Sequence, residues 1–276
     1  MPPAITLTQK LKDEYQTLFD TCIINPSRAT TVDKLAETIE QNRNRYAAVG
    51  DPMGIPWFFI GVVHNMESSQ NFKKHLHNGD PLTARTVQVP AGRPKTGTPP
   101  FTWEESAADS LQLKNLHKWT DWTIPGLLFK IEEYNGWGYR RFHADVLSPY
   151  LWSFTNHYKS GKYVADGKWS QTAVSGQCGA AALLRRLAEK GVIKFNVEGH
   201  PLPASVPVEE SVDPLAAFEP LVTYSTKQKT PQAEQLQKAL NLFPGIFIKV
   251  DGFAGKDTSD ALHKVTGHYL KGDPRA

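Results

Sequence analysis

Residues 56–68 read Pro-Trp-Phe-Phe-Ile-Gly-Val-Val-His-Asn-Met-Glu-Ser, and this stretch decides the fold. Seven of its side chains are large and apolar, and they are spread around every side of a helix rather than along one stripe. A helix of that kind is stable only when it is surrounded by other elements, so we expect it at the centre of a domain. Its C-terminal end carries Glu67, directly before a polar segment.

The flanking sequence predicts more helices and a small β-structure. Apolar residues recur at helical spacing over about Thr31–Ala48, and Thr31 is a plausible N-cap. Residues 75–100 are rich in Gly, Pro, Thr and Asn, and Thr86–Val89 alternates like a short strand. We therefore expect a small β-hairpin or a long loop here.

Downstream, the helical pattern resumes. Thr102 and Glu105 have the spacing of a capping box at the start of a helix. Further helices are expected near Ile124–Tyr134 and Gly179–Lys190. The predicted fold class is mainly α, an α+β arrangement with one small hairpin, plus a small helical module at the C-terminus.

Composition excludes several classes of protein. Hydrophobic residues make up 40% and charged residues 21% of the 276, as in a globular chain rather than a disordered one. The net charge of +3 comes without a run of Lys and Arg, so we expect no nucleic-acid partner. Two cysteines do not make a disulfide framework, and we expect Cys22 and Cys178 to be buried apolar side chains.

The sequence offers no targeting or membrane segment. No stretch approaches 18 consecutive apolar residues, and the first residues lack the apolar region of a signal peptide. We therefore expect a monomer that is made in the cytoplasm and does not insert into a membrane. A target outside the cell would be reached by release or by injection, as in a phage or bacterial lysis system.

Glu67 is the first candidate for chemistry. Cleavage of a glycosidic bond needs a carboxylic acid that is still protonated near neutral pH. Apolar surroundings and the negative end of a helix dipole both raise the pKa of a glutamate. The position of Glu67 at the end of an apolar helix meets both conditions.

Two motifs support this assignment. The segment Glu67-Ser68-Ser69-Gln70-Asn71-Phe72 resembles the Glu-Ser signature of lytic transglycosylases and goose-type lysozymes. Tyr134-Asn135-Gly136-Trp137 is similar to the Tyr-Asn-Ala-Gly motif of the same superfamily, with Gly in place of Ala. The resemblance implies a lysozyme-like catalytic domain. Glu67 would be the catalytic acid, and Ser68, Tyr134, Asn135 and Trp137 would lie near the substrate.

An aromatic segment follows at Ser148–Tyr158. Sugar-binding clefts place aromatic rings against pyranose rings, with amides and hydroxyls for the sugar hydroxyls. We expect Trp152 and Tyr158 to contribute to substrate binding, although packing in a small aromatic core is an equal alternative.

The second catalytic group is less clearly marked. A hydrolase needs a base at about 6.5–9.5 Å or a nucleophile at about 5–5.5 Å from the acid. Asp80 is the first candidate, with Thr83 or Thr86 positioning a water, and Glu105 and Asp109 are alternatives. A lytic transglycosylase would need no second carboxylate. No Cys and His set has metal-binding spacing, so we expect no metal and no cofactor.

The C-terminus differs in composition from the rest of the chain. Residues 1–200 form the expected catalytic domain and residues 201–229, which are rich in proline, an expected linker. Residues 230–276 contain Gln235-Leu236-Gln237 and Val250-Asp251-Gly252-Phe253-Ala254, which resemble the peptidoglycan-binding module. We expect Asp251-Gly252 to form a turn, Phe253 to fill the small core, and Thr258 or Asp257 to cap the next helix.

These observations predict a peptidoglycan hydrolase of the muramidase type, with bacterial cell wall as its partner. A lytic transglycosylase, a chitinase or chitosanase, and a noncatalytic wall-binding virion protein are the alternatives. The resemblance to a wall-binding module disfavours the chitinase.

Overall fold

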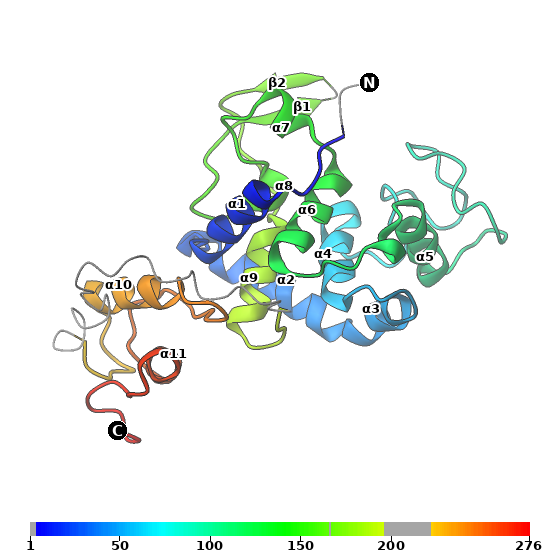
Figure 1. Ribbon diagram of the computed structural model, residues 1–276. Helices are drawn as coiled ribbons and strands as arrows, with labels where there is room; N and C mark the ends of the chain where they lie inside the picture. The colour runs from blue at the N-terminus through cyan, green and yellow to red at the C-terminus, as the bar shows by residue number, and fades with distance from the viewer. Residues whose placement is uncertain (1–3, 166, 196–221) are drawn as a thin grey trace. The chain divides into compact units, whose positions relative to one another are not determined.

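The computed structural model describes residues 4–165, 167–195 and 222–276 (Figure 1). The chain divides into two compact units, Met1–Lys194 and Phe195–Ala276. Each unit is considered by itself. The described residues are mainly helical, with a single two-stranded antiparallel sheet, as the sequence predicts.

The first unit contains nine α-helices and two strands within its described residues. They are α1 (Gln9–Asp20), α2 (Ala29–Gln41), α3 (Arg43–Gly50), α4 (Trp57–Ser68), α5 (Trp103–Leu113), α6 (Ile124–Asn135), α7 (Gly138–Phe142), α8 (Pro149–Trp152), β1 (Lys162–Ala165), β2 (Lys168–Ser170) and α9 (Ala180–Glu189). Short 3₁₀ turns at Pro26–Arg28, Asp51–Met53 and Leu116–Lys118 join some of them.

Helix α4 is the central element of this unit, as its composition predicts. It contacts α2, α3, α6 and α9 (Figure 1). Nearly all its side chains are buried. Gly61 allows the closest of these approaches, because a Cβ there would lie 2.6 Å from Ile39 Cγ2 on α2. The predicted helix over residues 56–68 is confirmed.

The helix predicted over Thr31–Ala48 is two helices. Helix α2 ends at Gln41 and α3 begins at Arg43, with Asn42 between them. The Asn42 side chain donates to the carbonyl oxygen of Thr38, which satisfies a backbone acceptor at the end of α2. The apolar spacing continues across this break, so periodicity alone did not reveal it.

The other helix predictions are confirmed. Helix α5 begins with the Thr102–Glu105 capping box, whose two reciprocal hydrogen bonds are both present. Helices α6 and α9 lie within one residue of the predicted ranges. Cys22 and Cys178 are free and buried.

The hairpin lies elsewhere than predicted. It is formed by β1 and β2, which pair antiparallel with Lys162 opposite Ser170. Thr86–Val89 forms no strand, because the backbone N–H groups of Val87 and Gln88 both donate to the Asp80 carboxylate. Val87 and Val89 are 79% and 89% exposed, so their alternation has no core to face.

Among the described residues no single helix is long and apolar enough to cross a membrane. The pair Arg43–Met53 and Trp57–Ser68 satisfies the length and composition test only together, and it is bent by 116°.

The second unit contains α10 (Pro231–Leu240) and α11 (Lys256–Thr266) in its described part. Leu236, Leu240 and Leu262 belong to its small core, which also includes Val222. Residues 222–229 therefore belong to the module rather than to the predicted linker, and residues 201–221 lie outside the described residues.

Gln237 organises the turn of the second unit. Its Oε1 accepts hydrogen bonds from the N–H groups of Asp251 and Gly252, at 2.9 and 2.8 Å. Gly252 has a φ of +80°, which confirms the predicted turn. Two predicted details were wrong. Phe253 is 38% exposed and Ala254 is buried in its place. The N-cap of α11 is Gly255, so neither Asp257 nor Thr258 caps this helix.

Candidate active site

Glu67 lies at the last turn of α4, where the helix ends in the left-handed residue Ser69. Its side chain is partly buried because α4 runs through the core of the unit. The hydroxyl of Tyr150, on α8, donates a hydrogen bond to Glu67 Oε1 at 2.6 Å. The carboxyl group is thereby held in one orientation by a residue 83 positions away.

Tyr134 and Lys114 complete the surroundings of this carboxyl group. The Tyr134 hydroxyl lies 2.6 Å from Ser110 Oγ on α5 and donates to the Leu76 carbonyl at 3.2 Å. Lys114 follows α5, with its Nζ 4.6 Å from the centre of the Tyr134 ring. Both residues interact electrostatically with Glu67.

The electrostatics of the site favour a protonated acid. Burial raises the pKa of Glu67, while the hydrogen bond from Tyr150 and the charge of Lys114 lower it, and burial prevails. Lys114 is exposed overall, and partial desolvation of its ammonium group lowers its pKa against the attraction of Glu67 and Glu133. A glutamate whose pKa is raised keeps its proton to higher pH than an exposed glutamate does, which is what a general acid requires.

The backbone around Glu67 is fixed from two sides. Gln177 donates from Nε2 to the Met66 carbonyl at 2.7 Å, which satisfies an acceptor at the end of α4. Gly79 has a φ of +80°, and a Cβ there would lie 3.0 Å from the Glu67 carbonyl oxygen. A side chain at position 79 would therefore force the polar loop away from the acid.

Asp80 lies in this loop, and its carboxylate holds the loop together. Oδ2 accepts from the Val87 and Gln88 backbone N–H groups at 2.8 and 2.9 Å and from Asn78 at 3.1 Å. Burial alone would raise the pKa of Asp80, but these hydrogen bonds outweigh it and lower the pKa. The group is ionised, as a base must be, yet one of its oxygens is committed to the loop.

The loop is also tied to α5 by a polar network. His75 Nδ1 lies 2.8 Å from Ser106 Oγ, and His77 Nε2 lies 2.9 Å from Asp109 Oδ1, which also pairs with Arg93. Ser106 is fully buried, so this Ser, His and Asp arrangement is no nucleophile site. Asp109 anchors the loop and Glu105 caps α5, so both alternatives to Asp80 have a structural role in the first unit.

The remaining predicted site residues differ in burial and in the contacts that they make. Ser68 is buried, and its hydroxyl donates back to the His64 carbonyl of α4, while Thr83 is exposed on the loop. Asn135 is exposed at the end of α6, and the ring of Trp137 lies 5.0 Å from that of Phe129.

Two predicted substrate-binding residues lie in the core. Trp152 is 1% exposed, and Tyr158 is 7% exposed with its hydroxyl donating to the Gly161 carbonyl. Buried rings offer no face to a sugar, so these two predictions are corrected in favour of the packing alternative. The aromatic segment contributes Tyr150 to the site instead.

Sequence reasoning missed Tyr150 and Lys114. Tyr150 belongs to the aromatic segment, but its neighbours in that segment gave no sign of which ring would turn toward Glu67. Lys114 belongs to no motif, and its position beside Tyr134 depends on a tertiary contact, in which its Nζ donates to the Tyr134 carbonyl oxygen at 3.3 Å. The part of the chain that is described contains no cluster of three His, Cys, Asp or Glu side chains able to hold a metal ion.

Comparison with known proteins gives no relative. No family model, no curated protein and no solved structure matches this chain.

Proposed function

We propose that this chain cleaves the β-1,4 glycan strand of bacterial peptidoglycan, with Glu67 as the general acid. The observation that carries the proposal is the partly buried carboxyl group of Glu67, which has a raised pKa and accepts a hydrogen bond from Tyr150 at 2.6 Å. The lysozyme-like character of the first unit is part of this proposal. It is supported by the order of the Glu67 and Tyr134 motifs and by the electrostatic interaction between these residues.

In the proposed reaction, protonated Glu67 transfers its proton to the glycosidic oxygen, and the bond from that oxygen to the anomeric carbon breaks. The Tyr150 hydroxyl then stabilises the carboxylate that remains, because it already donates to Oε1. Lys114 stabilises the same negative charge at longer range. These two groups therefore favour the product state of the proton transfer.

Hydrolysis is the first form of the proposal, with the ionised Asp80 as the base that activates water. Lytic transglycosylation is the second form, and one observation favours it: Asp80 Oδ2 already accepts three hydrogen bonds. In that form a hydroxyl of the sugar attacks its own anomeric carbon, and no second carboxylate is needed.

Muropeptide analysis tests the proposal and separates its two forms. Purified wall is incubated with the protein, and released fragments are identified by mass spectrometry. Reducing ends indicate hydrolysis, and 1,6-anhydro ends, lighter by one water, indicate transglycosylation. Glu67→Gln should release neither product, whereas Glu40→Gln, at an exposed position on α2, should release the same product as the unaltered chain at the same rate. Absence of any glycan cleavage by the unaltered protein would refute the activity.

For the second unit we propose binding to the cell wall, on the basis of the Gln237-centred turn and the motifs that resemble a wall-binding module. It would raise the local concentration of the first unit on its substrate. A chain that ends before residue 195 should still cleave soluble glycan fragments but sediment less with intact wall. Equal sedimentation of the two proteins would contradict this role.

A further inference from the structure

A cavity lies beside α6, and Glu132 of this helix is among the residues that line it. It has a volume of about 280 Å³, and it is lined by residues that include Glu14, Glu132, Arg140 and Ser148. Glu132 and Tyr134 are two residues apart on α6, which turns their side chains roughly 200° apart. The cavity is therefore separate from the candidate active site.

The polar side of this cavity carries an excess of negative charge. Arg140 pairs with Glu132 and with Glu14, both at 2.9 Å, so two carboxyl groups face one guanidinium. Glu132 Oε2 already accepts from the Tyr15 hydroxyl and from Arg140. A carboxylate has about four acceptor positions, so the pair keeps acceptor capacity for a further donor.

Ser148 supplies an independent observation. It is 3% exposed, it lines the cavity, and its Oγ has no hydrogen-bond partner among the described residues. Burying a hydroxyl group without a partner is unfavourable, so such groups usually have a ligand or water. The unpaired hydroxyl lies on the wall that also holds the two glutamates.

The remaining wall is apolar. Ala144, Val146 and Leu147 precede α8, and Trp152 lies at the end of that helix. Pockets for drug-sized ligands measure about 300–1,000 Å³, so this smaller cavity suits a compact ligand. An occupant must combine a short apolar body with a hydrogen-bond donor of positive charge.

We propose that this cavity binds a primary alkylammonium group. Its three N–H donors would reach Ser148 Oγ and the Glu14 and Glu132 carboxylates, and its alkyl chain would contact Val146 and Leu147. The positive charge balances the second carboxylate that Arg140 leaves uncompensated. This inference does not depend on glycan cleavage, because it uses a different face of α6.

Calorimetric titration of the full chain with n-butylammonium chloride tests the proposal, with n-butanol and sodium butyrate as matched neutral and anionic probes. We expect saturable binding of butylammonium and at least tenfold weaker binding of the other two. Ser148→Ala should weaken butylammonium binding by about tenfold, the usual effect of one hydrogen bond to a charged group. Glu14→Gln should weaken it further, since the cavity then loses its excess charge.

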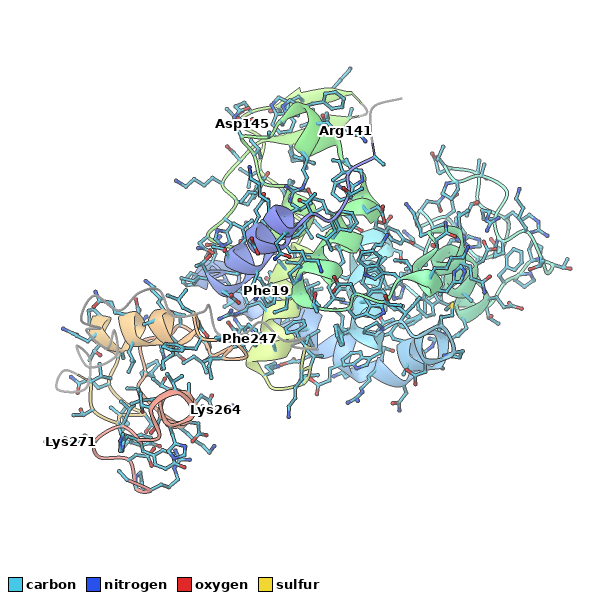
Figure 2. The ribbon with its side chains drawn as sticks, in the orientation of Figure 1. Phe19, Arg141, Asp145, Phe247, Lys264 and Lys271 are labelled. Atoms are coloured by element: carbon cyan, nitrogen blue, oxygen red, sulfur yellow. The ribbon has the colours of Figure 1, made fainter. Side chains whose placement is uncertain are left out.

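Asp145→Asn is the control, because Asp145 is exposed between α7 and α8 and is not among the residues that line the cavity (Figure 2). It should bind butylammonium as the unaltered chain does. Ser148→Ala should also keep the thermal midpoint or raise it, because the hydroxyl it removes has no partner. No saturable binding, equal binding of butanol, or an equal loss in Asp145→Asn would overturn the proposal.

Discussion

Glu67, which is partly buried, and Glu132, which is fully buried, each accept a hydrogen bond from a tyrosine but differ in their contact with a cation. Glu67 accepts a hydrogen bond from Tyr150 at 2.6 Å, and Glu132 accepts one from Tyr15 at 2.5 Å. Burial raises the pKa of both. Glu132 also forms an ion pair with Arg140 at 2.9 Å. Lys114 lowers the pKa of Glu67 through its charge alone.

This difference separates a structural carboxylate from a candidate acid. A guanidinium in contact stabilises the ionised form and ties Glu132 to α1 and α7, so the pair is part of the packing. Without such a contact, Glu67 keeps its proton more easily, and the proton is available for transfer. Burial alone would not distinguish the two residues.

The largest effect should come from Glu67→Gln. Glutamine keeps the shape and can still accept from Tyr150, but it cannot donate a proton as an acid. Wall lysis should fall by at least ~100-fold, as expected for the loss of general acid catalysis, and the unfolding midpoint should change little. Turbidity loss of a wall suspension measures the rate, and circular dichroism checks the fold. Near-normal lysis would remove Glu67 from the mechanism.

Glu132→Gln should instead affect stability. Removal of one partner from a buried ion pair typically costs about 3–5 kcal/mol, and less is expected here because Arg140 keeps Glu14. We expect a loss of about 1–3 kcal/mol in the free energy of unfolding, measured by urea denaturation, with lysis per folded molecule retained. If Glu132→Gln is as stable as the unaltered chain but does not lyse wall, Glu132 would be the candidate acid in place of Glu67.

The pH profile of lysis should depend on the residues that change the pKa of Glu67. Tyr150 and Lys114 both lower its pKa, so Tyr150→Phe and Lys114→Met should each raise it. The acid would then remain protonated to higher pH, and the alkaline limb of kcat/KM should move upward. The shift for Tyr150→Phe should be the larger of the two, because the hydrogen bond from Tyr150 lowers the pKa of Glu67 more than the charge of Lys114 does.

Lys118→Met, which removes an exposed lysine near α5, is the control for that profile. Its alkaline limb should coincide with that of the unaltered chain. A downward shift in Tyr150→Phe would show that the limb belongs to a different group.

The smallest effect concerns stability against pH. A glutamate whose pKa is raised by folding binds its proton more tightly in the folded state. Above the ordinary value of about 4.3, the unfolded chain releases this proton first, so stability falls as pH rises through that window. Glu67→Gln has no such proton to release. The free energy of unfolding of this variant, relative to that of the unaltered chain, should therefore increase as the pH rises from 4 to 7. Parallel curves would show that the pKa of Glu67 is not raised by folding.

Much of the local structure followed from the sequence alone. The apolar residues around α4 required a central helix, and the Thr102–Glu105 spacing fixed the start of α5, because both depend on neighbours within a few positions. The Asp251-Gly252 turn followed from the same kind of short-range chemistry. Glu67 could be named because its helix is apolar and its motif is contiguous.

Tertiary packing decided what local patterns could not. Thr86–Val89 has the alternation of a strand, but the backbone N–H group of Val87 donates to Asp80 and not to another strand. The antiparallel pair is formed by β1 and β2. Trp152 and Tyr150 lie two positions apart, yet one ring is in the core and the other holds Glu67. Their roles depend on contacts with α4 and α6, distant in sequence, and such contacts arise only when the helices pack together.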